Sequence, residues 1–99
     1  MITPKPKTVF ELFDGHPERW IKEVMFRDES RRFLHISESH RATCFCVEGA
    51  INWVYPKEKQ LAARNALRLF ILTDVNWEFN DDPSTTFEMM LAKVKEAGI

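Results

Sequence analysis

Apolar residues recur at helical spacing over most of the chain, and this pattern predicts a series of helices. The first is short and covers residues 9–14, where Thr8 and Glu11 form a capping box and Gly15 can end the helix in the left-handed conformation. Longer amphipathic patterns predict further helices over residues 40–54, 58–72 and 86–97. We therefore expect a mostly helical protein.

Two details of these helices predict specific contacts. Gly49 lies inside the second helix, where glycine costs about 1 kcal/mol relative to alanine, so we expect a close contact there with one of the two helices that follow. Thr85 and Glu88 form a second capping box. We therefore expect Thr85 to cap the last helix, which Gly98 would end.

The segment after the first helix fits two patterns. Residues 20–27 place apolar side chains both at helical spacing and at the alternation of a strand. Residues 32–36 alternate and are too short for a helix, and a strand needs a partner because unpaired backbone groups are costly. We therefore expect a β-hairpin in which about residues 21–27 pair with 32–36 across a turn at 28–31. A helix over the first half stays open.

Length and composition fit a single α+β domain. The chain has 99 residues, of which 44% are hydrophobic and 12% aromatic, enough to build a core. Residues 1–7 are rich in proline and lysine, so we expect a flexible tail followed by one globular domain over residues 8–99. Residues 74–83 are expected to form an acidic loop.

Charge and hydropathy argue against several functional classes. A net charge of −1 is not that of a strongly basic nucleic-acid-binding protein. No stretch approaches the roughly 20 apolar residues of a membrane helix, and the first residues lack the apolar segment of a signal peptide. We therefore expect a cytoplasmic protein whose Cys44 and Cys46 are reduced, packed thiols.

Histidine and cysteine come close together in sequence between His35 and Cys46. His40 and Cys44 are four residues apart on the predicted helix, a spacing that can present two ligands to one metal ion. The set matches no zinc module, so we expect no metal and no cofactor. A Cys46 nucleophile with a histidine base would need an exposed thiol of lowered pKa. Without other catalytic signals, we do not expect an enzyme.

Basic and aromatic residues alternate around the predicted hairpin. Such a ribbon can stack bases or hold phosphates. Interleaved carboxylates weaken its positive field, and cross-strand ion pairs are the alternative explanation. The residues of this ribbon are Arg19, Trp20, Lys22, Phe26, Arg27, Arg31, Arg32, Phe33 and Arg41.

Asn80 and Asp81 precede the last helix. Asn and Asp side chains accept hydrogen bonds from backbone amides and fix such loops, and we expect this structural role. The same groups could instead bind a cation or orient a ligand. The binding candidates taken from this loop and from the hairpin are Trp20, Arg27, Arg32, His35, Trp77, Asn80 and Asp81.

Two stretches, residues 46–51 and 79–86, resemble a family of small uncharacterised proteins from bacteria and their phages. The family pattern joins a central Cys-x-x-Gly-Ala helix to an aromatic-Asn-Asp loop that runs through a threonine into the last helix. Trp20 corresponds to an early tryptophan that is common there. The chain departs from the pattern at Phe79, where tryptophan is usual, and in its hairpin turn, which has no glycine. The resemblance implies a bacterial or phage source and no catalytic residues.

From these patterns we expect a non-enzymatic binding protein in the bacterial cytoplasm, which is the host cytoplasm if a phage encodes it. Its partner is expected to be a host or phage protein, in a regulatory or counter-defence role. The alternative is a nucleotide or other small anion held by the arginine and aromatic hairpin. We expect no membrane association, and a homodimer stays open.

Overall fold

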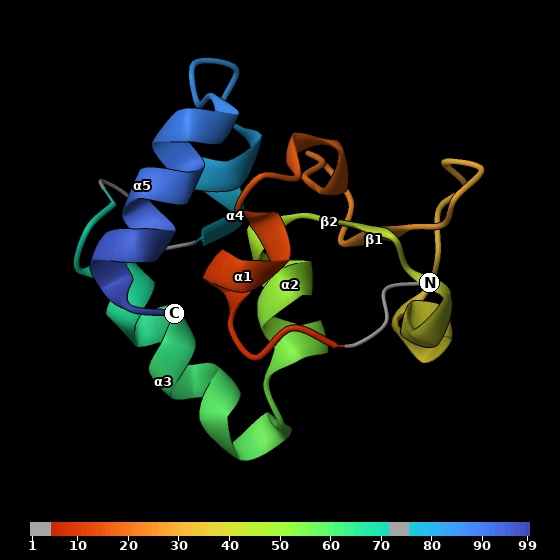
Figure 1. The fold of residues 1–99 in the computed structure, drawn as a ribbon, viewed down its shortest axis with the longest axis horizontal. Helices are drawn as coiled ribbons and strands as arrows, with labels where there is room; N and C mark the ends of the chain where they lie inside the picture. Colours follow the sequence, from red (N-terminus) through yellow and green to blue (C-terminus); the bar gives the residue numbers. More distant parts are fainter. Residues whose placement is uncertain (1–4, 72–75) are drawn as a thin grey trace.

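The computed structural model describes residues 5–71 and 76–99, and the first residues of the expected tail lie outside this range. The described helices are α1 (Val9–Phe13), α2 (Val47–Val54), α3 (Lys57–Arg68), α4 (Asn76–Asp81) and α5 (Phe87–Ala97) (Figure 1). The 3₁₀-helices η1 (Pro17–Arg19) and η2 (Ile36–Arg41) and the strands β1 (Phe26–Arg27) and β2 (Cys44–Phe45) complete the described elements. The predicted class, mostly helical α+β, is confirmed.

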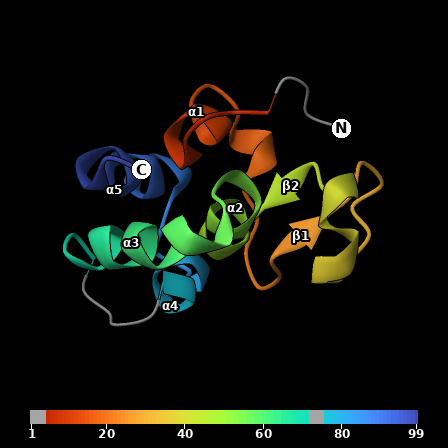
Figure 2. The same ribbon diagram turned by 90° about the horizontal axis from the view of Figure 1, so that it is seen from below.

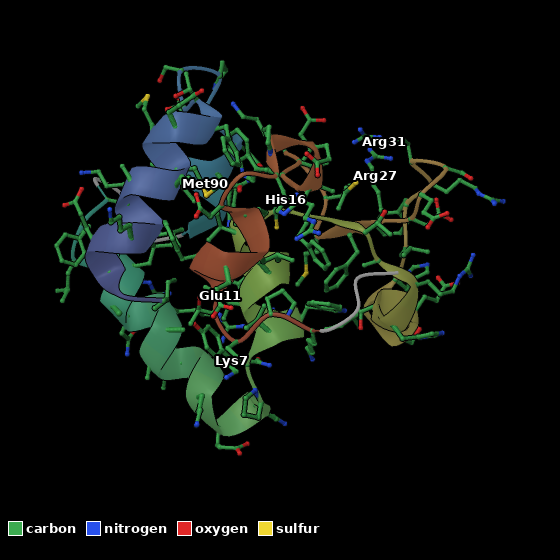
Figure 3. The ribbon with its side chains drawn as sticks, viewed as in Figure 1. Lys7, Glu11, His16, Arg27, Arg31 and Met90 are labelled. Carbon is green, nitrogen blue, oxygen red and sulfur yellow. The ribbon has the colours of Figure 1, made fainter. Side chains whose placement is uncertain are left out.

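Helix α2 lies at the centre of the molecule. It packs against α1 on one side and α4 on the other (Figure 2). Helices α3 and α5 pack against each other at one end, and Met90 points from α5 toward the centre (Figure 3). Ile51 of α2, Leu67 of α3 and Met90 are fully buried in the resulting core.

Local capping fixes α1 and the C-terminal end of α5 as predicted. The Thr8 hydroxyl accepts a hydrogen bond from the Glu11 amide at 3.0 Å, and Gly15 follows α1 at a φ of +76°. Gly98 ends α5 in the left-handed region, at a φ of +72°. Only residues near one another in sequence are involved in these contacts, so the sequence pattern alone was enough to find them.

The predicted N-cap of α5 is wrong by one residue. The hydroxyl of Thr86, rather than that of Thr85, accepts the Met89 amide at 3.2 Å. The Thr85 amide donates to the Asp82 carbonyl at 3.0 Å, so Thr85 belongs to the preceding turn. Thr85 is buried, and its carbonyl accepts a hydrogen bond from Lys22 Nζ at 2.9 Å.

The predicted hairpin between residues 21–27 and 32–36 has the wrong partner strand. β1 pairs antiparallel with β2, with Phe26 opposite Phe45. Glu23 has a φ of +76°, outside both the extended and the right-handed helical regions. Neither the long first strand nor the alternative helix can therefore run through this position.

A turn does form at residues 28–31, but it is followed by one bridge rather than a strand. The Asp28 amide donates to the Arg32 carbonyl at 3.0 Å, and Arg27 then forms an isolated bridge with Phe33. The chain continues into η2 instead of extending the pairing. β2 therefore pairs along one edge of β1, while residues 32–34 meet the other edge only briefly, where the Leu34 amide donates to the Phe26 carbonyl at 3.1 Å.

The helix predicted over residues 40–54 begins later than expected. The residues predicted to form its first part lie in η2 and β2 instead, because the backbone of β2 is paired with β1. Cys46 is the N-cap of α2, and its thiol accepts a hydrogen bond from the Gly49 amide at 3.2 Å. The packed cysteine expected from the sequence therefore also holds a helix terminus.

Two predicted boundaries near the end of α3 also change. The helix predicted over residues 58–72 ends at Arg68, and residue 72 lies outside the described residues. The loop predicted over residues 74–83 contains α4, while Asp74 lies outside the described residues.

Of the helices in the described ranges, none is long and apolar enough to cross a membrane.

Gly49 makes the close contact that the sequence predicted, but with a different partner. A Cβ atom added at Gly49 would overlap the backbone of Met25, with the Met25 carbonyl carbon 3.0 Å away. The Met25 carbonyl oxygen also accepts a hydrogen bond from the Cys46 amide at 3.2 Å. The start of α2 therefore lies against the segment that leads into β1, not against another helix.

Candidate functional site

Asn80, near the end of α4, joins separate segments through its side-chain amide. Its Oδ1 atom accepts hydrogen bonds from Trp20 Nε1 at 2.6 Å and from the Val47 amide at 2.9 Å. Its Nδ2 atom donates to the Ile21 carbonyl at 3.0 Å. Asn80 is fully buried, and Val47 is the first residue of α2, whose amide has no partner within the helix. One amide group therefore holds α4, the start of α2 and the segment after η1 together.

Asp81 extends this network to Glu23. Its Oδ1 atom accepts hydrogen bonds from the Glu23 amide at 2.8 Å and from Asn80 Nδ2 at 2.9 Å. The Glu23 amide belongs to the residue with positive φ, a conformation that residues other than glycine adopt rarely. The expected structural role of Asn80 and Asp81, in which they bind backbone amides, is confirmed.

A small groove opens beside this network, between α4 and the segment that leads into β1. Its volume is about 220 Å³. Trp77 of α4 lines it and is 57% exposed. The remaining lining consists of the largely apolar Val24, Met25 and Cys46 and of the acidic Glu23, Glu48 and Asp81.

The acidic residues of the groove differ in their partners. Glu48 forms an ion pair with Arg64 of α3. Neither Glu23 nor Asp81 forms an ion pair with any residue that the structure describes. The groove therefore carries more negative than positive charge.

Cys46 lies at the groove with an unreactive thiol. Burial raises the pKa of the Cys46 thiol to about 11, and the nearby carboxylates of Asp81 and Glu48 act in the same direction. Hydrogen bonds from the amides of Gly49 and Glu48 offset only part of this. The thiol is protonated at neutral pH, which is the opposite of what a cysteine nucleophile requires.

The proposed spacing of His40 and Cys44 does not occur on one helix. His40 lies in η2 and Cys44 lies in β2, so the two side chains are not presented by successive helical turns. Within residues 5–71 and 76–99, no group of three or more His, Cys, Asp or Glu side chains is placed to hold a metal ion.

Asp28 organises the segment of residues 27–32, here called the basic turn, which precedes Phe33. Its Oδ1 atom accepts the amides of Ser30 and Arg32 at 2.9 and 3.0 Å. Its Oδ2 atom lies 3.5 Å from Arg32 Nε and 3.6 Å from Arg41 Nη2. The hydrogen bond from the Arg32 amide is the largest cause that lowers the pKa of the Asp28 carboxyl group, and the Ser30 amide and both arginines add to it. One carboxylate thus forms ion pairs with two arginines of the basic and aromatic ribbon, one of which, Arg32, is a binding candidate.

Arg27 and Arg31 extend to the same side of the molecule (Figure 3). Arg27 Nη1 donates to the Arg31 carbonyl at 2.8 Å, and Arg31 Nη1 lies 3.6 Å from Cys44 Sγ. Neither arginine forms an ion pair with a carboxylate in the described part of the chain. Phe26 is 1% exposed and cannot stack on a ligand, whereas Phe33 is 52% exposed.

The binding candidates taken from the sequence fall into two groups. The first group consists of Trp77, Asn80 and Asp81 on α4 together with Trp20, which donates a hydrogen bond to Asn80. The second group, at and after the basic turn, consists of Arg27, Arg32 and His35, and the ring of His35 meets that of Phe33 edge-on at 5.1 Å.

Sequence reasoning missed Glu23 and Glu48 as groove residues. Nothing in the neighbouring sequence marks either one. Glu23 reaches the groove because Asn80 and Asp81 hold its segment beside α4. Glu48 reaches it because α2 begins at Val47. Both placements depend on contacts between residues far apart in the sequence.

Comparison with protein families matches residues 16–98 to DUF6197, a family of unknown function. No curated protein and no solved structure matches the chain. The match agrees with the expected membership of a family without an assigned activity and covers both α4 and the basic turn. The chain belongs to this family of unknown function.

Proposed function

We propose that this protein acts by binding a partner protein through the groove beside Trp77. In this proposal it is a small bacterial or phage protein that contacts a host or phage protein in a regulatory or counter-defence role. The observation that carries the proposal is the indole of Trp77, which is 57% exposed at the groove. Tryptophan is highly buried on average and is enriched among the residues that dominate binding energy at interfaces.

The frame around Trp77 supports binding because it is fixed before a partner arrives. Asn80 and Asp81, on the same helix, hold α2 and the segment before β1 through hydrogen bonds of 2.8 to 3.0 Å. A preorganised surface loses less conformational entropy on binding than a mobile one. The raised pKa of Cys46 favours binding over thiol chemistry at this groove.

Affinity capture with matched variants tests the proposal. The tagged protein, its Trp77→Ala variant and its Leu61→Ala variant are used to capture proteins from a bacterial lysate. Leu61 is 62% exposed on α3, so its variant also loses an exposed apolar side chain, but away from the groove. We expect a protein that the wild type and Leu61→Ala retain and Trp77→Ala loses. Equal capture by all three proteins would contradict the proposal.

A second candidate function is the binding of a nucleotide or other small anion at the basic turn. The observation that favours it is the pair Arg27 and Arg31, whose guanidinium groups have no carboxylate partner among the described residues. A ligand at 100 times its Kd should add about 2.7 kcal/mol to the free energy of unfolding. Thermal-shift measurements with nucleotides should give a shift that Arg27→Ala and Arg31→Ala remove. No shift with any nucleotide would eliminate this candidate.

A further inference from the structure

We propose that the groove beside Trp77 receives a cationic side chain, an arginine or lysine, from the partner protein. This inference rests on the proposed function and adds to it the chemistry of the contact. Three properties of the groove support it: a volume that suits one side chain, a lining that is both apolar and aromatic, and a negative charge.

The size of the groove fits one side chain. Its volume is about 220 Å³. Sites for small molecules usually enclose about 300–1,000 Å³. A nucleotide or a comparable metabolite would therefore extend beyond the groove, whereas one long side chain would fill it.

The lining of the groove matches the two parts of a lysine or arginine side chain. Val24 and Met25 offer apolar contact to the methylene stem. The face of the Trp77 indole can attract a cationic head group, and arginine is the most frequent partner in such contacts. An apolar side chain would contact only Val24 and Met25 and would leave the carboxylates of Glu23 and Asp81 without a counter-ion.

The charge of the groove selects against anions. The carboxylates of Glu23 and Asp81 are not ion-paired within the described residues. The neighbouring cation Lys22 is engaged elsewhere, because its Nζ atom donates to the carbonyls of Asp82 at 2.6 Å and Thr85 at 2.9 Å. A cation from a partner would therefore meet carboxylates that lack an internal counter-ion, while an acidic side chain would be repelled.

The backbone beneath the groove is fixed. The Met25 carbonyl accepts the Cys46 amide at 3.2 Å, and the Met25 backbone lies directly against Gly49. The Glu23 amide is held by Asp81 at 2.8 Å. The backbone that carries Glu23 and Met25 is therefore fixed before a ligand binds, which lowers the entropic cost of binding.

A pair of small probes of the same shape tests the inference. The ¹⁵N-labelled protein is titrated with Nα-acetyl-arginine methylamide, and separately with Nα-acetyl-citrulline methylamide, which lacks the charge. The indole N–H signals are followed by NMR, and Trp77→Ala assigns the signal of Trp77. The indoles of Trp20 and Trp53 donate internally to Asn80 and Ser39, so their signals serve as references. We expect the arginine probe to shift the Trp77 signal and the citrulline probe to have little effect.

Variants that remove one carboxylate test how much Glu23 contributes to binding of the arginine probe. Glu23→Gln should weaken binding of the arginine probe by about twofold to fivefold, the range of an exposed ion pair. Glu58→Gln serves as the matched control because Glu58 is an exposed carboxylate on α3. We expect its affinity for the probe to equal that of the wild type.

Equal shifts with the two probes, or no shift of the Trp77 signal with either one, would overturn the cationic assignment. So would equal affinity of Glu23→Gln and the wild type. None of these results alters the capture experiment, in which a partner that depends on Trp77 would still support the proposed function. If no captured protein depends on Trp77, the proposed function itself fails.

Discussion

The α4 region and the basic turn are each organised by one polar side chain, Asn80 and Asp28, but over different distances in the sequence. Asn80 is uncharged and fully buried, and it bonds to groups 33 and 59 residues away. The Asp28 carboxylate accepts amides only two and four residues away. The amide of Asn80 therefore holds the tertiary structure together, whereas the backbone contacts of Asp28 shape a local turn.

This difference predicts how each region responds to substitution. Removing one partner of a buried hydrogen bond leaves the other without compensation, at about 1–3 kcal/mol for each group. The ion pairs of Asp28 reach exposed arginine side chains, and pairs with an exposed partner contribute about 0–1 kcal/mol. Substitutions around α4 should therefore affect stability more than substitutions around the basic turn.

The largest effect is expected for Asn80→Ala. The change leaves Trp20 Nε1, the Val47 amide and the Ile21 carbonyl without their partner. We expect the free energy of unfolding to fall by about 3 kcal/mol or more, measured by chemical denaturation. Asn65→Ala, at an exposed position of α3, is the control and should change it little. A loss below about 1 kcal/mol for Asn80→Ala would remove its central role.

Gly49→Ala should come next. The new Cβ atom would overlap the Met25 backbone, and overpacking of this kind costs about 1–3 kcal/mol. The change also raises helix propensity by about 1 kcal/mol, which opposes the loss. Ala62→Gly at an exposed position of α3 measures that propensity alone. If Gly49→Ala melts at a higher temperature than the wild type, the close contact with Met25 is wrong.

Thr86→Ala tests a local contact that does not depend on Asn80. The Thr86 hydroxyl accepts the Met89 amide at the start of α5. Its loss should lower the free energy of unfolding by about 1 kcal/mol, and Thr86→Ser should restore most of this because serine caps helices well. Equal stability of the alanine and serine variants would show that the cap contributes nothing.

The smallest effect concerns acid stability at the basic turn. The pKa of Asp28 is held below its ordinary value of 3.8 in the folded protein, so its carboxylate stabilises the fold above that pH. This contribution is lost as the pH falls below 3.8 through the folded pKa. Denaturation at a series of acidic pH values should show a shallower decline for Asp28→Asn than for the wild type. Identical pH profiles would contradict the assignment.

The parts of the fold that the sequence predicted are those fixed by neighbouring residues. Thr8 and Gly98 cap helices through contacts within a few residues, and both predictions were confirmed. The partner of β1 and the position of Glu23 depend on distant contacts, and the sequence did not identify them. Asn80 and Asp81 were correctly expected to bind backbone amides, but the sequence did not indicate which amides.

The most direct test of the central claim compares stability and binding in the single variant Trp77→Ala. The side chain is 57% exposed and lies beside the Asn80 network without being part of its hydrogen bonds. The account predicts a free energy of unfolding close to that of the wild type together with loss of the captured partner. A variant that retains its partner, or that loses binding only because it unfolds, would contradict the account.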